Sequence, residues 1–194
     1  MNRIERQTRA VPSKFETRED DGGLFIEGYF AVFNSVYELW PGASESVAPG
    51  AFGNSMGEDV RALVDHETRL VLGRNKAGTL ELREDSHGLW GKIRINKDDT
   101  DAMNLYNRVK RGDVDQCSFG FEIVKEDTEV REDGSVHWTI REVKLYEVSV
   151  VTFPAYEETS VAARKKDYET VRARENEQWR ANMRQKLKGE KDGT

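Results

Sequence analysis

The chain of 194 residues has only one cysteine, three histidines and no long apolar run. One cysteine cannot form a disulfide within the chain, which favours a reducing compartment. No segment approaches the roughly 18 apolar residues that a membrane-spanning helix needs, and no apolar segment of the signal-peptide kind follows the charged N-terminus. Glycine motifs of the P-loop or dinucleotide-binding type are also missing. We therefore expect no membrane span, no signal peptide and no nucleotide cofactor.

The net charge of −6 is unevenly distributed along the chain. Residues 164–194 hold ten Lys or Arg and six Asp or Glu, a net of +4, which leaves 20 and 30 for residues 1–163, a net of −10. An acidic body argues against duplex nucleic acid as its ligand. The basic tail could contact an acidic partner or nucleic acid, but its charges of both signs are interspersed, and a solvated helix explains that pattern equally well.

The hydrophobic pattern predicts a mainly β chain with a few helices, of the α+β class. Residues 1–20 are polar and irregular, which indicates a flexible N-terminal arm. We expect residues 21–163 to form one strand-rich domain, a barrel or closed sheet. Residues 164–194 have a helix-forming composition with a thin apolar stripe, and we expect a polar, charged helical tail there.

Within the domain, strands are expected where aromatic and β-branched residues cluster between turn residues. These segments are residues 24–33, 60–66, 70–73, 79–83, 89–95, 115–122, 136–140 and 142–151. One helix is well signalled, with capping residues at 98–100 and a left-handed stop at Gly112. The connection over residues 37–57 is expected to be a long loop that includes a short helix at 51–56.

Ser118 lies in the segment Asp115–Glu122 and is the first candidate for chemistry. No G-x-S-x-G motif surrounds it, so residue type alone favours a structural serine over a nucleophile. Gly120 leaves open space beside the hydroxyl on the same face of the strand, where a substrate backbone could approach. Cys117 faces the other way, beside Phe119, and a small buried hydrophobic residue is expected there rather than a nucleophile.

His66 is the best candidate for a general base among the three histidines. His87 lies in a predicted turn and His137 begins a strand after a predicted hairpin turn, so both are expected at the surface. His66 ends the apolar face of a strand, where its ring could be held by packing while its tip faces a cleft. No metal site is indicated, because Asp65, His66 and Glu67 are consecutive and cannot all point at one ion from a regular strand.

Glu147 is the third candidate, because strand alternation places this carboxylate on the same face as Val143, Leu145 and Val151. A carboxylate on such a face needs a partner. That partner is either a basic residue or the second ring N–H of a histidine, whose tautomer the carboxylate would fix. Asp65 is the alternative acid, but neighbouring strand residues point to opposite faces, which makes an Asp65–His66 pair geometrically poor.

Four blocks in this order resemble the prohead maturation proteases of tailed bacteriophages, over residues 24 to about 163. They read IEGYFAVFN, VAPGAF, CSFGF and LYEVSVVTFPA, at residues 26–34, 47–52, 117–121 and 145–155. The resemblance implies a serine endopeptidase with a closed β-barrel ringed by helices, similar to herpesvirus assemblin. It assigns Ser118 as nucleophile and His66 as base, with no cofactor or metal. Herpesvirus relatives use a second histidine as third member, but neither His87 nor His137 lies in a matching motif here, so Glu147 is preferred.

The resemblance also implies a biological setting. Family members act in the host cytoplasm, inside the immature capsid, where they remove scaffold segments from the major capsid protein and process themselves. The tail of residues 164–194 could then be a targeting helix or a homodimer element. The competing hypotheses are a catalytically idle capsid assembly or scaffolding subunit, and a nucleic-acid packaging factor that uses the basic tail.

Overall fold

The structure is a computed structural model that describes residues 7–12, 15–20, 22–153 and 158–189. The chain divides into two compact units, one within Met1–Glu157 and the other within Glu158–Thr194. The second unit contains the helix α2 (Glu158–Gly189). Nearly all of the side chains described in α2 are exposed or half-buried, including Trp179 and Met183. No helix in the described part of the chain is both long enough and apolar enough to cross a membrane.

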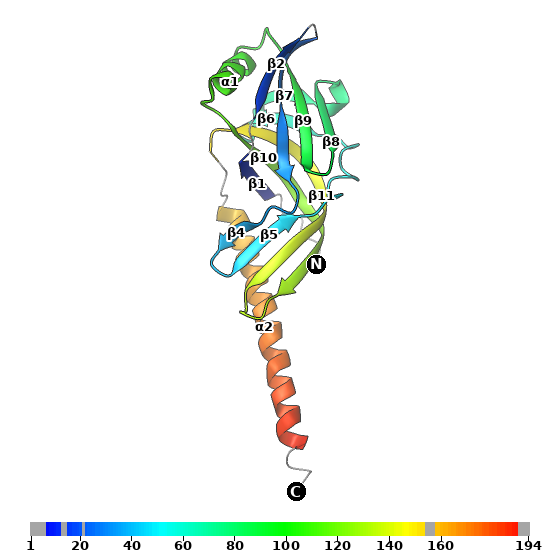
Figure 1. Cartoon of the computed structure of the whole chain (residues 1–194), viewed down its shortest axis with the longest axis vertical. Coiled ribbons are helices and arrows are strands. Elements are labelled where there is room, and N and C mark those ends of the chain that lie inside the picture. Colours follow the sequence, from blue (N-terminus) through cyan, green and yellow to red (C-terminus); the bar gives the residue numbers. More distant parts are fainter. Residues whose placement is uncertain (1–6, 13–14, 21, 154–157, 190–194) are drawn as a thin grey trace. The chain divides into compact units, whose positions relative to one another are not determined.

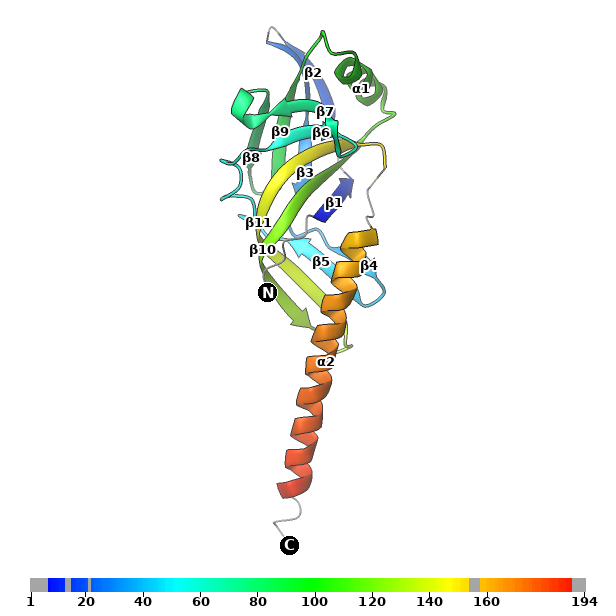
Figure 2. The same cartoon turned by 180° about the vertical axis from the view of Figure 1, so that it is seen from behind.

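The first unit is built from two β-sheets (Figures 1 and 2). The larger sheet has seven strands in the order β1-β10-β11-β5-β4, with β6 also paired to β11 and β7 paired to β6. The smaller sheet has the order β2-β3-β9-β8. The strand bounds are β1 Gln7–Pro12, β2 Glu16–Asp20, β3 Gly23–Val32, β4 Tyr37–Trp40, β5 Ala43–Val47, β6 Arg61–Val64, β7 Glu67–Arg74, β8 Leu80–Glu84, β9 Gly88–Ile95, β10 Gln116–Val130 and β11 Val136–Val151.

The mainly β, α+β composition is as predicted, but the sheets are not closed into a barrel. Among the described residues no strand pairing joins the two sheets, and the unit has one α-helix and a single 3-10 turn, η1 (Asn75–Ala77), instead of a ring of helices. Within the larger sheet, the edge of β11 away from β10 pairs with β5 at one end and β6 at the other. Between them an irregular segment takes over, with Val143 N–H donating to Ala51 O at 3.0 Å and Leu145 N–H to Ser55 Oγ at 3.1 Å.

Two other segments differ from the sequence-based expectations. The supposed arm of residues 1–20 contains β1 and β2, which pair with β10 and β3. The supposed long loop of residues 37–57 contains the hairpin of β4 and β5, followed by turns at 51–56 instead of a short helix. Short strands of this kind lack the alternation that identifies a strand, and the partner of β1 also lies far away in the sequence.

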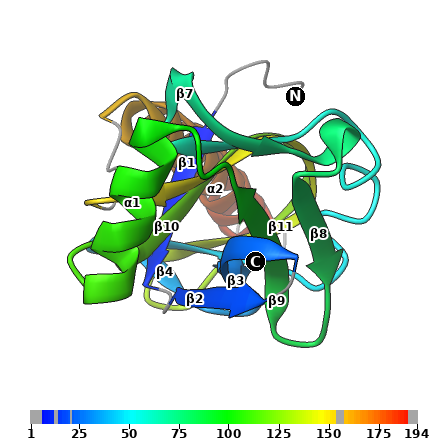
Figure 3. The same cartoon turned by 90° about the horizontal axis from the view of Figure 1, so that it is seen from above.

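The predicted internal helix is confirmed as α1 (Thr100–Arg111). Asp99 caps it by accepting the N–H groups of residues 101 and 102, and Gly112 ends it with a φ of 82°. The buried face is the predicted one, made of Ala102, Leu105, Tyr106 and Val109. This face packs against β2, β3, β7 and β9 at one end of the two sheets (Figure 3).

A β-bulge in β11 decides which side chains face the core. Gly120 of β10 pairs with Glu147, but the next residue, Phe121, pairs with Leu145, so Tyr146 is an extra residue on β11. An extra residue in one strand shifts the alternation of every side chain beyond it. The positions of β11 whose side chains share a face with a given set of β10 side chains therefore shift by one residue at the bulge.

Directly opposite side chains of an antiparallel pair lie on the same face of the sheet. Leu145 thus shares the face of Phe121, toward the hydrophobic core, while Glu147 and Ser149 share the face of Ser118. The predicted placement of Glu147 beside Val143 and Leu145 is wrong, because a bulge cannot be seen in a pattern of residue types. The core face of β10 also holds Cys117, Phe119 and Ile123.

Phe119 provides a test of this core. Its ring is fully buried and lies 4.8 Å from that of Phe121 and 5.3 Å from that of Phe52, measured between centroids. We expect Phe119→Ala to lower the free energy of unfolding by about 3–5 kcal/mol, because it removes these contacts and leaves a cavity. Urea unfolding followed by tryptophan fluorescence measures the change. Phe153→Ala is the control, since Phe153 is 78% exposed; a similar loss in both variants would contradict the described core.

Candidate active site

The turn between β6 and β7 carries His66. Asp65 and His66 have positive φ angles of 46° and 60°, and Val64 pairs with Glu67 across them. Two consecutive left-handed residues form the two-residue hairpin turn that suits the twist of antiparallel strands, and Asp and His tolerate this conformation better than most residues. The sequence pattern predicts that His66 ends a strand, but the structure places it in a turn.

Asp65 holds this turn against the end of β11. Its carboxylate accepts the Thr152 N–H at 2.7 Å and the Thr152 hydroxyl at 3.3 Å, and its own N–H donates to the Val150 carbonyl at 3.0 Å. With both oxygens engaged by Thr152, Asp65 positions the backbone of the turn. It is not the carboxylate that meets His66.

Glu147 is the carboxylate that contacts His66. His66 Nδ1 lies 2.8 Å from Glu147 Oε1, and Ser149 donates its hydroxyl to Glu147 Oε2 at 2.6 Å. The glutamate side chain is 2% exposed and the histidine side chain 16%. A carboxylate only accepts hydrogen bonds, so it fixes the hydrogen of a neutral imidazole on Nδ1 and leaves the lone pair on Nε2.

Ser118 lies on β10 directly opposite Ser149 of β11, on the same face of the sheet. It is fully buried, and its hydroxyl donates to the backbone carbonyl of Arg9 in β1 at 2.9 Å. The structure thus brings His66 and Glu147 into direct contact and places Ser118 on the neighbouring strand, opposite the serine that binds Glu147. His66 Nε2 is buried and has no hydrogen-bond partner in the described part of the chain.

Ser149 and Arg9 belong to this site although the sequence pattern assigns them no role. Ser149 stands two residues after Glu147, the spacing that puts two strand side chains on one face, and this spacing could have revealed it. Arg9 contributes a backbone carbonyl from a strand that the sequence does not indicate. Cys117 is buried as predicted, with its thiol 3.0 Å from the Tyr29 carbonyl on the core side of β10.

The other two histidines lie elsewhere. His87 is exposed, as expected. His137 is buried, contrary to expectation, and its two ring nitrogens lie 2.8 Å and 2.9 Å from the hydroxyls of Ser44 and Ser46. It pairs with Glu129 at the far end of the hairpin. With a rise of about 3.3 Å per residue, His137 lies about 40 Å along β11 from Ser149. His137 is therefore too distant to be a third member of the site.

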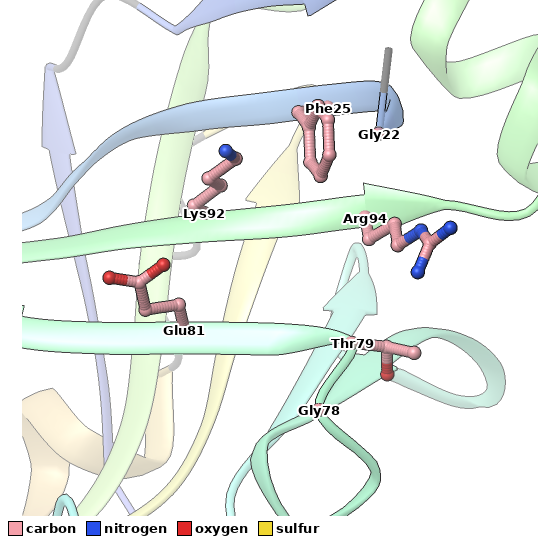
Figure 4. Close-up of a pocket in the computed structure, with 7 residues that line it drawn as sticks. All are labelled: Gly22, Phe25, Gly78, Thr79, Glu81, Lys92 and Arg94. Atoms are coloured by element: carbon pink, nitrogen blue, oxygen red, sulfur yellow. The ribbon is translucent and has the colours of Figure 1, made fainter. Parts of the chain in front are cut away.

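Two other kinds of site, a surface pocket and a metal-binding group, are of interest among the described residues. A surface pocket on the smaller sheet is lined by residues of β3, β8 and β9 and their flanking glycines, with the Lys92 ammonium 3.9 Å from the ring centroid of Phe25 (Figure 4). Its lining includes none of Ser118, His66 and Glu147. In the part of the chain that the structure describes, no three Asp, Glu, His or Cys side chains form a metal-binding group.

His137 makes stability depend on pH. Burial, and then the charge of Arg131, lower its pKa below the usual 6.5. The unfolded chain binds the proton first, so the free energy of unfolding falls as the pH drops below about 6.5. We expect His137→Gln, which keeps polar groups near both serines, to weaken this fall. Urea unfolding at about pH 7.5 and about pH 5 measures it, with the exposed His87→Gln as control. An undiminished pH dependence in His137→Gln would refute the assignment.

Comparisons with known proteins identify the family of the chain. The model of the caudovirus prohead serine protease family matches residues 13–174. The prohead protease of Enterobacteria phage HK97 is 31% identical over 166 residues, which make up 82% of this chain and 69% of that protein. The capsid assembly protease of bacteriophage T4 shares 11% identity with a TM-score of 0.45, over 76% of this chain and 99% of that one. The family match and the HK97 relative show that the chain belongs to the caudovirus prohead serine protease family.

Proposed function

We propose that the chain is a serine endopeptidase of the Ser-His-acid type, with Ser118 as nucleophile, His66 as general base and Glu147 as the residue that orients His66. The observation that carries this proposal is the 2.8 Å contact between His66 Nδ1 and the buried carboxylate of Glu147. A buried acid that fixes the tautomer of an imidazole is the arrangement that activates a nearby hydroxyl. Family membership supports a serine as the nucleophile, and Ser118 lies opposite Ser149, the serine that binds Glu147.

The chemistry follows from these groups. The Ser118 hydroxyl turns from the Arg9 carbonyl toward His66 Nε2 and gives up its proton as Oγ attacks the scissile carbonyl carbon. Glu147 stabilises the imidazolium that forms, and the imidazolium then protonates the leaving amine. Water hydrolyses the acyl-enzyme with His66 again as base. The bond from Ser149 to Glu147 Oε2 keeps the carboxylate aligned through both steps.

We take the substrate to be the scaffold segment of the major capsid protein, together with the chain itself. The curated relative from phage HK97 is a prohead protease, and the resemblance of the sequence blocks points the same way. The enzyme would then act inside the immature capsid in the host cytoplasm. The helix α2, with Trp179 and Met183 exposed along it, is available as a targeting or homodimer element.

One observation favours a different function. Ser118 is fully buried and bonded to the Arg9 carbonyl, which would suit a catalytically idle subunit that only assembles with capsid proteins. The two functions differ in a simple property, because an idle subunit keeps both its own mass and that of the capsid protein over time.

Ser118→Ala separates these functions. We expect it to abolish trimming of the chain and cleavage of the cognate capsid protein, because the attacking oxygen is gone. Mass spectrometry of the purified chain, alone and mixed with capsid protein, follows both products over time. Ser86→Ala is the matched control, since Ser86 is an exposed turn residue, and should cleave like the parent. Equal cleavage by Ser118→Ala and the parent would disprove the proposal.

Glu147→Gln tests the orienting role. The amide keeps the shape of the side chain, but it can present N–H to His66 Nδ1 and so favour the wrong tautomer. We expect kcat to fall by roughly 10²- to 10⁴-fold with little change in KM. Steady-state kinetics on a peptide that spans a capsid cleavage site measure both constants. A kcat within about twofold of the parent would mean that another group orients His66.

A further inference from the structure

β1 occupies the edge of β10 beside Ser118. It lies beside β10 (Figure 2) and pairs with it in antiparallel register, with Ala10 opposite Ser118 and Arg9 opposite Phe119. In the described part of the chain β10 is its only strand partner. Addition of an extended segment to a sheet edge is a common way to bind a peptide. The segment already on this edge presents the Arg9 carbonyl 2.9 Å from Ser118 Oγ.

This contact holds Ser118 in an arrangement that does not transfer its proton to His66. The hydroxyl of Ser118 donates to a backbone carbonyl of β1, while His66 Nε2 is buried without a hydrogen-bond partner among the described residues. A base that is correctly oriented by Glu147 is therefore not engaged by the hydroxyl it would activate. The strand takes up the hydrogen bond of the Ser118 hydroxyl and covers the edge of β10 that a second peptide would need.

The side chain of Arg9 is held in a buried acidic pocket. Its guanidinium forms a two-pronged ion pair with Glu45 of β5, through Nε to Oε1 and Nη2 to Oε2. Nη1 donates to the Thr8 carbonyl at 2.8 Å and Nη2 to Gln7 Oε1 at 2.9 Å. The guanidinium also lies 5.7 Å from the ring centroid of Phe121. A planar guanidinium matches a carboxylate in this way and an ammonium does not.

The Glu45 pocket requires a positive charge, but a strand other than β1 could supply it. Glu45 is 1% exposed, and an uncompensated buried carboxylate is strongly unfavourable. The fit of β1 is incomplete, however, because Gln7 Nε2, Thr8 Oγ1 and the Tyr37 hydroxyl are buried without hydrogen-bond partners in the part of the chain described. A strand with arginine at the position of Arg9 and better-placed neighbours would satisfy the pocket at least as well.

We propose that the β10 edge beside Ser118 is a binding site for an extended peptide with arginine at the position of Arg9, that Glu45 selects this arginine, and that β1 occupies the site as an internal inhibitory strand. The inhibitory part rests on the function proposed above for Ser118. The binding part does not, because it depends only on strand pairing and on the Glu45 pocket. β1 must leave the edge before a substrate can bind.

Two measurements on the full-length chain test these parts separately. The first is the rate at which a fluorophosphonate probe labels Ser118. We expect Arg9→Met to label about tenfold faster than the parent, because the fraction of molecules with an open edge rises. Arg18→Met is the control, since Arg18 lies on β2 in an exposed ion pair with Asp20, and it should label at the parental rate. Equal rates for Arg9→Met and the parent would overturn the inhibitory role.

The second measurement is the binding of a fluorescein-labelled peptide, Gln-Thr-Arg-Ala-Val-Pro, to the full-length Ser118→Ala/Arg9→Met chain by fluorescence polarisation. We expect it to bind at least about tenfold more tightly than the same peptide with citrulline, the neutral isostere of arginine. Adding Glu45→Gln should remove this preference. Equal affinity of the two peptides, or a preference that survives Glu45→Gln, would overturn the assignment of Glu45.

The outcomes distinguish this inference from the proposed function. If no variant is labelled at Ser118 but the arginine peptide binds selectively, the peptide site stands and the serine protease mechanism and the inhibitory role fall. If Ser118→Ala abolishes cleavage but Arg9→Met changes neither labelling nor peptide binding, the protease stands and β1 is a permanent structural strand. If circular dichroism shows that Arg9→Met is unfolded, Arg9→Lys replaces it, because lysine keeps the charge but loses the two-pronged pair. The expected labelling rate and peptide selectivity are the same.

Discussion

The irregular pairing of β10 with β11 is the constraint on which the rest of the unit depends. One extra residue, Tyr146, lets the hairpin present apolar side chains to the core on both sides of the bulge and still place Glu147 and Ser149 beside Ser118 on the other face. Without the bulge, strand alternation would put either the carboxylate or Leu145 on the wrong side. The core and the candidate active site therefore share one backbone irregularity.

How well the sequence predicts each part of the structure depends on how far apart along the chain the interacting residues lie. The helix α1 was predictable with both caps, because its signals lie within a few residues of each other. Ser118, His66 and Glu147 could be named as candidates, but the reason for choosing Glu147 was mistaken, since the bulge removes it from the face of Leu145. The open sheets, the buried position of His137 and the strand β1 depend on partners distant in sequence, which local patterns do not reveal.

The two buried carboxylates of the larger sheet illustrate different solutions to the same physical problem. Glu147 contacts the titratable His66 and accepts a hydrogen bond from the neutral Ser149, and on the proposed mechanism it stabilises the charge that develops on the imidazole. Glu45 is matched by the permanent charge of Arg9. Burial of an ion pair adds little net stability compared with apolar packing, which agrees with the proposed role of Glu45 in selecting an arginine.

The topology of the hairpin and the turn has a consequence for the timing of activity. Ser118 and Glu147 belong to one hairpin, but His66 reaches Glu147 from 81 residues earlier in the chain, through the parallel pairing of β6 with β11. Parallel pairs with large sequence separation form late, because chain entropy is lost before their contacts are gained. On the proposed mechanism, a nascent or partly folded chain therefore lacks His66 beside Glu147, and its peptidase activity begins only when the larger sheet is complete.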